Sequence, residues 1–161
     1  MCTIHIRRGM LLRLALPTML VALACSVVSP QTATPGIVQV ATYANKGWQD
    51  TGLVIAPGKQ ISIEYVSGLW FEDPPDQWHD ASGGPNAWTC TAAECHEPLP
   101  NFPKYALIGK IGESDTLLRI GNRLDWVAEV SGPLYLRANY GDEDIAIFNP
   151  EGAVTVKITS R

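Results

Sequence analysis

The sequence is poor in the side chains that nucleophilic enzymes need. It contains three His, and only His79 and His96 follow the N-terminal region. There is no Gly-x-Ser-x-Gly turn of the kind that presents a catalytic serine. A nucleophile also needs a base within hydrogen-bond reach, and two histidines offer little choice. Acidic residues are numerous, but glycosidases additionally require a carboxyl group set in an apolar pocket. We therefore expect a protein that is not an enzyme.

The sequence also lacks an apolar run long enough to cross a membrane, which takes about 20 residues. The uncharged apolar run Leu14–Ala24 has eleven residues, follows Arg7, Arg8 and Arg13, and ends in Ala22-Leu23-Ala24. A basic start, a short apolar stretch and small residues at the end are the parts of a secretory signal. We predict that residues 1–24 are a signal peptide and that the protein is exported, to the periplasm or the cell surface.

Cys25 directly follows the predicted cleavage site. The letters "VALAC" resemble a bacterial lipobox, in which the Cys becomes the lipidated first residue of the mature protein, although Ala22-Leu23-Ala24 also fits ordinary cleavage at the same bond. A lipid on Cys25 would be the protein's attachment to a membrane, and Ser26 is compatible with outer-membrane delivery. Residues 25–36 then form a short polar, proline-containing tether.

Positive charge is scarce once the predicted signal is removed. Three Arg leave with residues 1–24, so 9 of the 12 Lys and Arg remain against 16 Asp and Glu, a net charge of −7. Nucleic acids and anionic membrane surfaces bind clustered positive charge. We therefore expect no nucleic-acid partner.

Two cysteines lie close together beyond the tether. Cys90 and Cys95 have the spacing Cys-x4-Cys, which differs from the Cys-x-x-Cys of redox motifs. In an exported protein such a pair is expected to form a disulfide. Zinc bound by Cys90, Cys95 and His96 is the alternative, but it would need a fourth ligand from a distant part of the chain.

No helical periodicity follows the signal. Instead, short alternating segments rich in Val, Ile, Leu and Tyr are separated by Gly, Pro, Asn and Asp, the pattern of β-strands joined by turns. We predict an all-β fold, an antiparallel β-sandwich or jelly roll of about eight or nine strands over residues 37–161. The predicted strands are 37–43, 51–56, 60–66, 105–111, 116–120, 124–130, 134–139 and 153–159.

One irregular segment, residues 71–104, is too long for an ordinary turn and is expected to be functional. It contains Trp78 and Trp88 among polar residues, where an aromatic ring can stack on the C–H face of a sugar. Packing of either ring onto the sandwich is the alternative interpretation. Trp48 and Trp70 flank predicted strands and are expected to pack in the core or at its edge.

Four segments carry a family resemblance: "ANKGWQDTGLVIAPGKQISIEYVSGLW" (44–70), "PLPNFPKYALIGKIG" (98–112), "GPLYLRAN" (132–139) and "NPEGAVTVKI" (149–158). Together they resemble the PA-IL-like family, the bacterial galactose-binding lectins and their related domains, from about Val38 to Thr159. The resemblance implies the sandwich fold and, by analogy, binding of galactose-like sugars on a glycan.

The resemblance also implies a calcium ion, held by a carbonyl after the "SGxW" strand and by groups near the C-terminus. In the family, an Asn-Asp pair is followed after six residues by Asn-Asn-x-Gly. Here Tyr140 follows Asn139, but Asp142 precedes Asn149 with six residues between, and Pro150 replaces the second Asn. The resemblance implies these metal ligands: the carbonyl of Glu72, Asp142, the carbonyl of Ala146, Asn149 and, as a replacement, Asp144 or Glu151.

The sugar contacts that the resemblance implies are Asp142 and Asn149, through the ion. Trp78, by stacking, and the neighbouring His79 are the candidate contacts from the long segment, although His79 has no matching position in the family pattern. We hypothesise an exported, calcium-assisted, lectin-like domain. The alternative is a non-catalytic structural or interaction module of the cell envelope, in which the sugar site has degenerated. No sequence feature indicates the oligomeric state.

Overall fold

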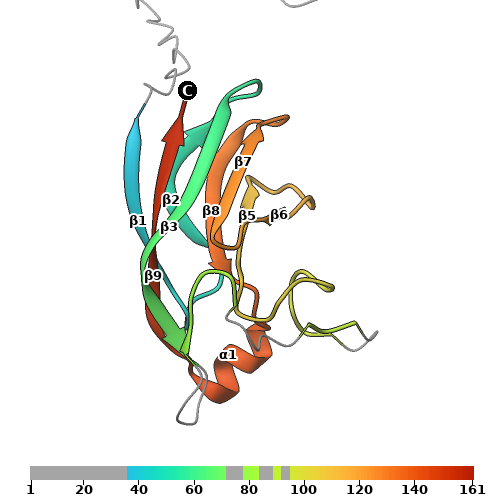
Figure 1. Ribbon diagram of the computed structural model, residues 1–161. Helices are drawn as coiled ribbons and strands as arrows, with labels where there is room; N and C mark the ends of the chain where they lie inside the picture. The colour runs from blue at the N-terminus through green and yellow to red at the C-terminus, as the bar shows by residue number, and fades with distance from the viewer. Residues whose placement is uncertain (1–35, 72–77, 84–88, 92–94) are drawn as a thin grey trace, which may run out of the picture. The chain divides into compact units, whose positions relative to one another are not determined.

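The structure is a computed structural model that describes residues 36–71, 78–83, 89–91 and 95–161 (Figure 1). The chain divides into the units Met1–Pro30 and Gln31–Arg161, and all described residues belong to the second. The predicted signal peptide, Cys25, Glu72 and Trp88 lie outside the described residues. In the described ranges, no helix is long and apolar enough to span a membrane.

The alternating segments form two antiparallel sheets. In sheet A, β9 (Glu151–Ser160) lies between β1 (Ile37–Tyr43) and β3 (Gln60–Phe71). The other edge of β3 pairs with β7 (Arg123–Val127) at its start and with β4 (Trp78–His79) at its end. Sheet B has the order β2 (Gln49–Ile55), β8 (Gly132–Ala138), β5 (Leu107–Ile111), β6 (Leu118–Arg119). The described residues thus contain nine strands, and the prediction of an antiparallel β-sandwich is confirmed.

The core lies between the sheets because each strand turns every second side chain inward. Alternate residues of β9 and β8 are fully buried, among them Val154, Val156, Ile158, Leu134 and Leu136. Trp70, near the end of β3, is also fully buried, so of the two placements expected for it, the core or its edge, the core is the observed one.

Two details of the secondary structure differ from the sequence prediction. Strand β3 continues to Phe71 instead of ending at Val66, because a bulge between Tyr65 and Ser67 restores pairing with β9. The acidic segment 141–150, where we expected no helix, forms a two-turn helix α1 (Asp142–Phe148) at the end of the sandwich (Figure 1). Three acids in its first turn stabilise the positive end of the helix dipole, an effect that apolar periodicity does not reveal.

Glycine at position 152 permits a close approach of β3 and β9. Gly152 has φ +88°, and a Cβ atom there would overlap the backbone carbonyl of Leu69. A Cβ atom at Gly68 on β3 would likewise overlap the backbone carbonyl of Ala153. The "NPEG" segment of the family resemblance therefore contains a glycine that the packing of two strands requires.

We predict that Gly152→Ala lowers the free energy of unfolding by about 3 kcal/mol, because left-handed strain and overpacking act together. Gly58 is the matched control, since it has φ +78° but open space around its Cα. Gly58→Ala should cost only about 1 kcal/mol. Urea unfolding of both variants measures the difference, and equal losses would contradict the packing argument.

Candidate functional site at one end of the sandwich

Helix α1 separates the predicted calcium ligands. Asp142 begins the helix and Asn149 caps its end in a left-handed conformation. At 1.5 Å rise per residue, their Cα atoms lie about 10 Å apart along the axis, so the two side chains leave opposite ends of the helix. Ala146 is in the last turn, and Pro150 cannot donate a hydrogen bond to its carbonyl.

The carboxylate of Asp142 is already paired with a cation of the chain. Arg137, at the end of β8, donates from Nη2 to Asp142 Oδ1 over 2.7 Å and to the carbonyl of Tyr140 over 2.6 Å. The guanidinium is buried, with 2% of the side chain exposed, while 78% of the Asp142 side chain is exposed. Asp144, the replacement ligand, lies 3.9 Å from His96 Nδ1 instead.

Tyr140 stands where the resemblance expects an aspartate, and its ring belongs to a buried stack. The rings of Tyr140 and Tyr105 lie 4.5 Å apart, and His79 stacks on the other face of Tyr105 at 4.7 Å. Lys104 Nζ lies 4.8 Å from the centre of the Tyr140 ring. The carboxylate is thus replaced by aromatic packing with an ammonium group beside it.

These placements do not favour one calcium ion held by the described predicted ligands, since Asp142 and Asn149 lie at opposite ends of α1 and Asp142 contacts a guanidinium. Among the described residues, one group of three His, Cys, Asp or Glu is close enough to share a metal: Cys90, Cys95 and Glu97. Cys90 and Cys95 are joined by a disulfide, so their sulfur atoms are not available to a zinc ion. The calcium prediction stays a prediction, because Glu72 is outside the described residues.

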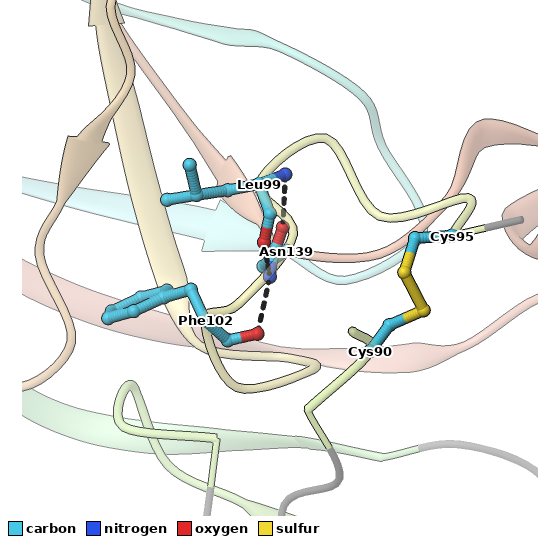
Figure 2. The surroundings of a disulfide bond; sticks show 5 residues. All are labelled: Cys90, Cys95, Leu99, Phe102 and Asn139. Carbon is cyan, nitrogen blue, oxygen red and sulfur yellow. Dashed lines mark hydrogen bonds between the residues drawn. A yellow bond between two sulfur atoms is a disulfide. The ribbon is translucent and has the colours of Figure 1, made fainter. Parts of the chain in front are cut away.

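Asn139, the last residue of "GPLYLRAN", has a structural role. Figure 2 shows its side chain between Leu99 and Phe102, near the Cys90–Cys95 disulfide. Its Oδ1 accepts from the N–H of Leu99 over 2.9 Å, and Nδ2 donates to the carbonyls of Leu99 and Phe102 over 3.0 and 3.1 Å. The fully buried amide therefore fastens the loop before β5 to the end of β8.

Trp78 and His79 are neighbours in β4, and strand alternation sends them to opposite sides. His79 is buried, and its Nδ1 donates to the carbonyl of Gly83 over 2.6 Å. Trp78 faces outward and is 53% exposed. Of these two predicted sugar contacts, only Trp78 is available to a ligand on the outer face of sheet A.

Trp78 belongs to an exposed aromatic area that sequence reasoning did not anticipate. Its ring centre lies 4.6 Å from that of Phe71, which pairs with Trp78 on one side and with Glu151 on the other. Directly paired residues share a face, so the three side chains form one row on the outside of sheet A. The exposed side chains of Leu69 and Tyr43 form the adjacent row, one on each side of Ala153. We call these five residues the Trp78 surface.

Had the bulge in β3 been recognised in the sequence, strand alternation beyond it would have predicted Phe71 on this face. The bulge itself was not recognisable in the sequence, because "YVSG" looks like the end of a strand. Arg137 was missed for another reason: it lies within a segment that the resemblance identified as scaffold, and its partners are set by the turn before α1.

Two depressions elsewhere contain none of the predicted sugar-binding residues. One, of about 210 Å³, lies beyond the end of β5 and is mainly apolar, with Trp126 and Leu118 among its lining residues. The other, of about 180 Å³, lies on the outer face of sheet A over β3, β7 and β9. Its charged side chains pair with one another: Lys157 Nζ lies 2.8 Å from Glu64, and Arg123 Nε lies 2.7 Å from Asp125.

These ion pairs lower the pKa values of both acids. The hydrogen bond from Lys157 holds the pKa of Glu64 below its ordinary value of 4.5. The hydrogen bond from Arg123 holds the pKa of Asp125 below 3.8, and one from Ser62 adds to the effect. The same pairing with Asp125 raises the pKa of Arg123. The outer face of sheet A at this end is a set of satisfied, solvent-exposed ion pairs.

Comparison with known proteins supports the fold. No protein-family model matches the chain, and no curated protein matches its sequence. A solved structure titled "EclA N-terminal domain; PllA-like lectin" is similar, with a TM-score of 0.56 and 14% identity, over 78% of this chain and 98% of that one. At this identity the similarity shows the fold alone. The chain therefore has a lectin-like β-sandwich, while membership of the PA-IL-like family is not shown.

We predict a loss of stability in acid from the Glu64 and Asp125 pairs. A carboxylate whose pKa is lowered on folding stabilises the protein above its unfolded pKa, and the contribution disappears as the pH falls through the folded pKa. The unfolding temperature should therefore decrease below about pH 4.5. Glu64→Gln combined with Asp125→Asn should flatten this decrease, and Glu113→Gln with Asp115→Asn, on an exposed turn, should not. Parallel curves for all three proteins would contradict the prediction.

We predict that Asn139→Ala lowers the free energy of unfolding by about 2–3 kcal/mol, because it leaves part-buried backbone groups of the loop before β5 without their side-chain partner. Asn122→Ala is the control, since Asn122 is exposed and makes one side-chain hydrogen bond of 3.3 Å to Asp80. Its cost should stay within about 0.5 kcal/mol. Chemical unfolding curves of the two variants provide the measurement, and a neutral Asn139→Ala would be inconsistent with an anchoring role.

Proposed function

We propose that the domain of residues 37–161 binds carbohydrate and that a glycan contacts the Trp78 surface. The observation that carries this proposal is the exposed Trp78 ring, held against Phe71 on a sandwich similar to that of a lectin domain. A sugar presents C–H groups on one face and hydroxyl groups around its edge. A fixed aromatic ring suits the first, and a neighbouring carboxylate accepts hydrogen bonds from the second.

The geometry of the Trp78 surface supplies both kinds of contact. Contact with Phe71 limits the rotation of the Trp78 ring, so little side-chain freedom would be lost on binding. Glu151, in the same row, is exposed and directs a carboxylate to the same face. Asn149 precedes Glu151 by two residues and ends α1, so its amide adds a donor and an acceptor near this edge.

Galactose-like sugars are the first ligands to test, because the family resemblance implies them. The binding experiments include calcium as a condition, because the family resemblance also implies a calcium ion. Export through the signal peptide and lipidation of Cys25 complete the proposal, since both would place a glycan-binding domain at the periplasm or the cell surface. No catalytic activity is proposed.

The test is binding of the full chain to a glycan array and to galactosides by titration calorimetry, with calcium and with chelator. We expect Trp78→Ala to weaken binding at least about tenfold, a loss of about 1.4 kcal/mol, because the stacking face disappears. Trp78→Phe should keep part of the affinity. Unfolding temperatures should be nearly unchanged, since the Trp78 ring is exposed.

Val127→Ala is the matched control, because Val127 is exposed on the same face of sheet A at the other end of β3. It should bind like the wild type. If no glycan binds under either metal condition, the envelope-module alternative is favoured. Binding that is unaffected by Trp78→Ala would place the sugar elsewhere on the domain.

A further inference from the structure

We propose that Arg137 supplies, from within the chain, the positive charge that the family resemblance assigns to calcium, so that this end of the sandwich is organised without a metal ion. Arg137 acts as a positioning residue for the turn into α1. The inference concerns the folding of this turn and does not rest on carbohydrate binding.

The contacts of the guanidinium are the first argument. Its Nη2 donates to the carbonyl of Tyr140 and to the carboxylate of Asp142, and its Nε donates to the carbonyl of Ala138 over 3.2 Å. Backbone carbonyls and a carboxylate are the oxygen ligands that calcium selects in proteins. The same types of oxygen atoms are here gathered around an arginine, whose planar group offers several donors in fixed directions.

Burial is the second argument. An arginine with 2% of its side chain exposed is retained only if its charge is compensated. Asp142 provides the opposite charge, and the ring of Trp48 lies 5.4 Å from the guanidinium carbon. Trp48 belongs to the loop between β1 and β2, so Arg137 connects three segments: this loop, the end of β8 and the first turn of α1.

The replacement of a carboxylate is the third argument. Where the resemblance expects an aspartate, Tyr140 is fully buried in a ring stack and Lys104 lies over its ring. The position has lost a negative charge, while two fixed cations lie beside it. A divalent ion placed between Arg137 and Lys104 would be repelled by both. We therefore interpret Tyr140 in place of the aspartate and the buried Arg137 as linked: a cation of the chain takes the place of the metal ion and its aspartate ligand.

The experiment measures thermal unfolding and amide hydrogen exchange of the full chain in about 10 mM calcium, which saturates even weak extracellular calcium sites, and in chelator. Wild type should unfold at the same temperature in both. Arg137→Gln should lower that temperature in both conditions and accelerate exchange of the α1 amides about tenfold or more. The unfolding temperature and exchange rates of Arg137→Lys should lie between those of wild type and Arg137→Gln. Lysine keeps the positive charge but lacks the planar guanidinium group with its several donors. Arg119→Gln, an exposed arginine, is the control for loss of charge.

Asp142→Asn provides a test that does not remove a buried side chain. It should accelerate exchange in α1 more than Glu143→Gln does, because Glu143 is an acid of the same helix turn, 80% exposed, whose ion pair is with His96 and not with Arg137. The proposal is overturned if calcium raises the unfolding temperature of the wild type by several degrees. It is also overturned if Arg137→Lys and Asp142→Asn leave the exchange of α1 unchanged. Neither outcome depends on whether a glycan binds, so failure of this inference and failure of the proposed function can be distinguished.

Discussion

The antiparallel pairing of β3 with β9 is the constraint on which the rest of the structure depends. It joins segments about ninety residues apart in the chain and runs from Ile61 and Ser160 to Phe71 and Glu151. Because β9 occupies one edge of β3, β7 and β4 share the other. The close approach at Gly68 and Gly152 lets the two strands stay paired to their ends. The row that contains Trp78 exists only because this pairing continues beyond the bulge.

Strand alternation then decides which side chains meet solvent. Trp70 and Phe71 are neighbours in sequence, yet one is fully buried and the other faces outward beside Trp78. His79 is carried into the interior by the same rule and stacks on Tyr105. Chemical character alone does not separate Trp70 from its neighbour Phe71. Their positions in paired strands separate the residues that stabilise the fold from those that a ligand can reach.

Near α1, at the same end of the sandwich, charged side chains pair with one another within the chain. Arg137 and Asp142 form an ion pair between the end of β8 and the start of α1, and Asn139 fixes the loop before β5 through its amide. Arg137 and Asn139 both come from the short segment "RAN", next to Tyr140. A few adjacent side chains therefore contact the first turn of α1, the loop before β5 and the aromatic stack.

The sequence by itself determined the all-β sandwich, because alternation and turn residues are local signals that survive without knowledge of partners. It also placed Trp70 in the core and paired Cys90 with Cys95. Only the tertiary structure decided that the acidic segment is a helix, since its apolar side chains show no helical stripe and its N-cap, Gly141, has no side chain to cap the first turn. It likewise decided that Asp142 faces Arg137 and that Phe71 lies beside Trp78. Those neighbours depend on strand register and on a turn conformation, and both are determined by contacts between residues far apart in the chain.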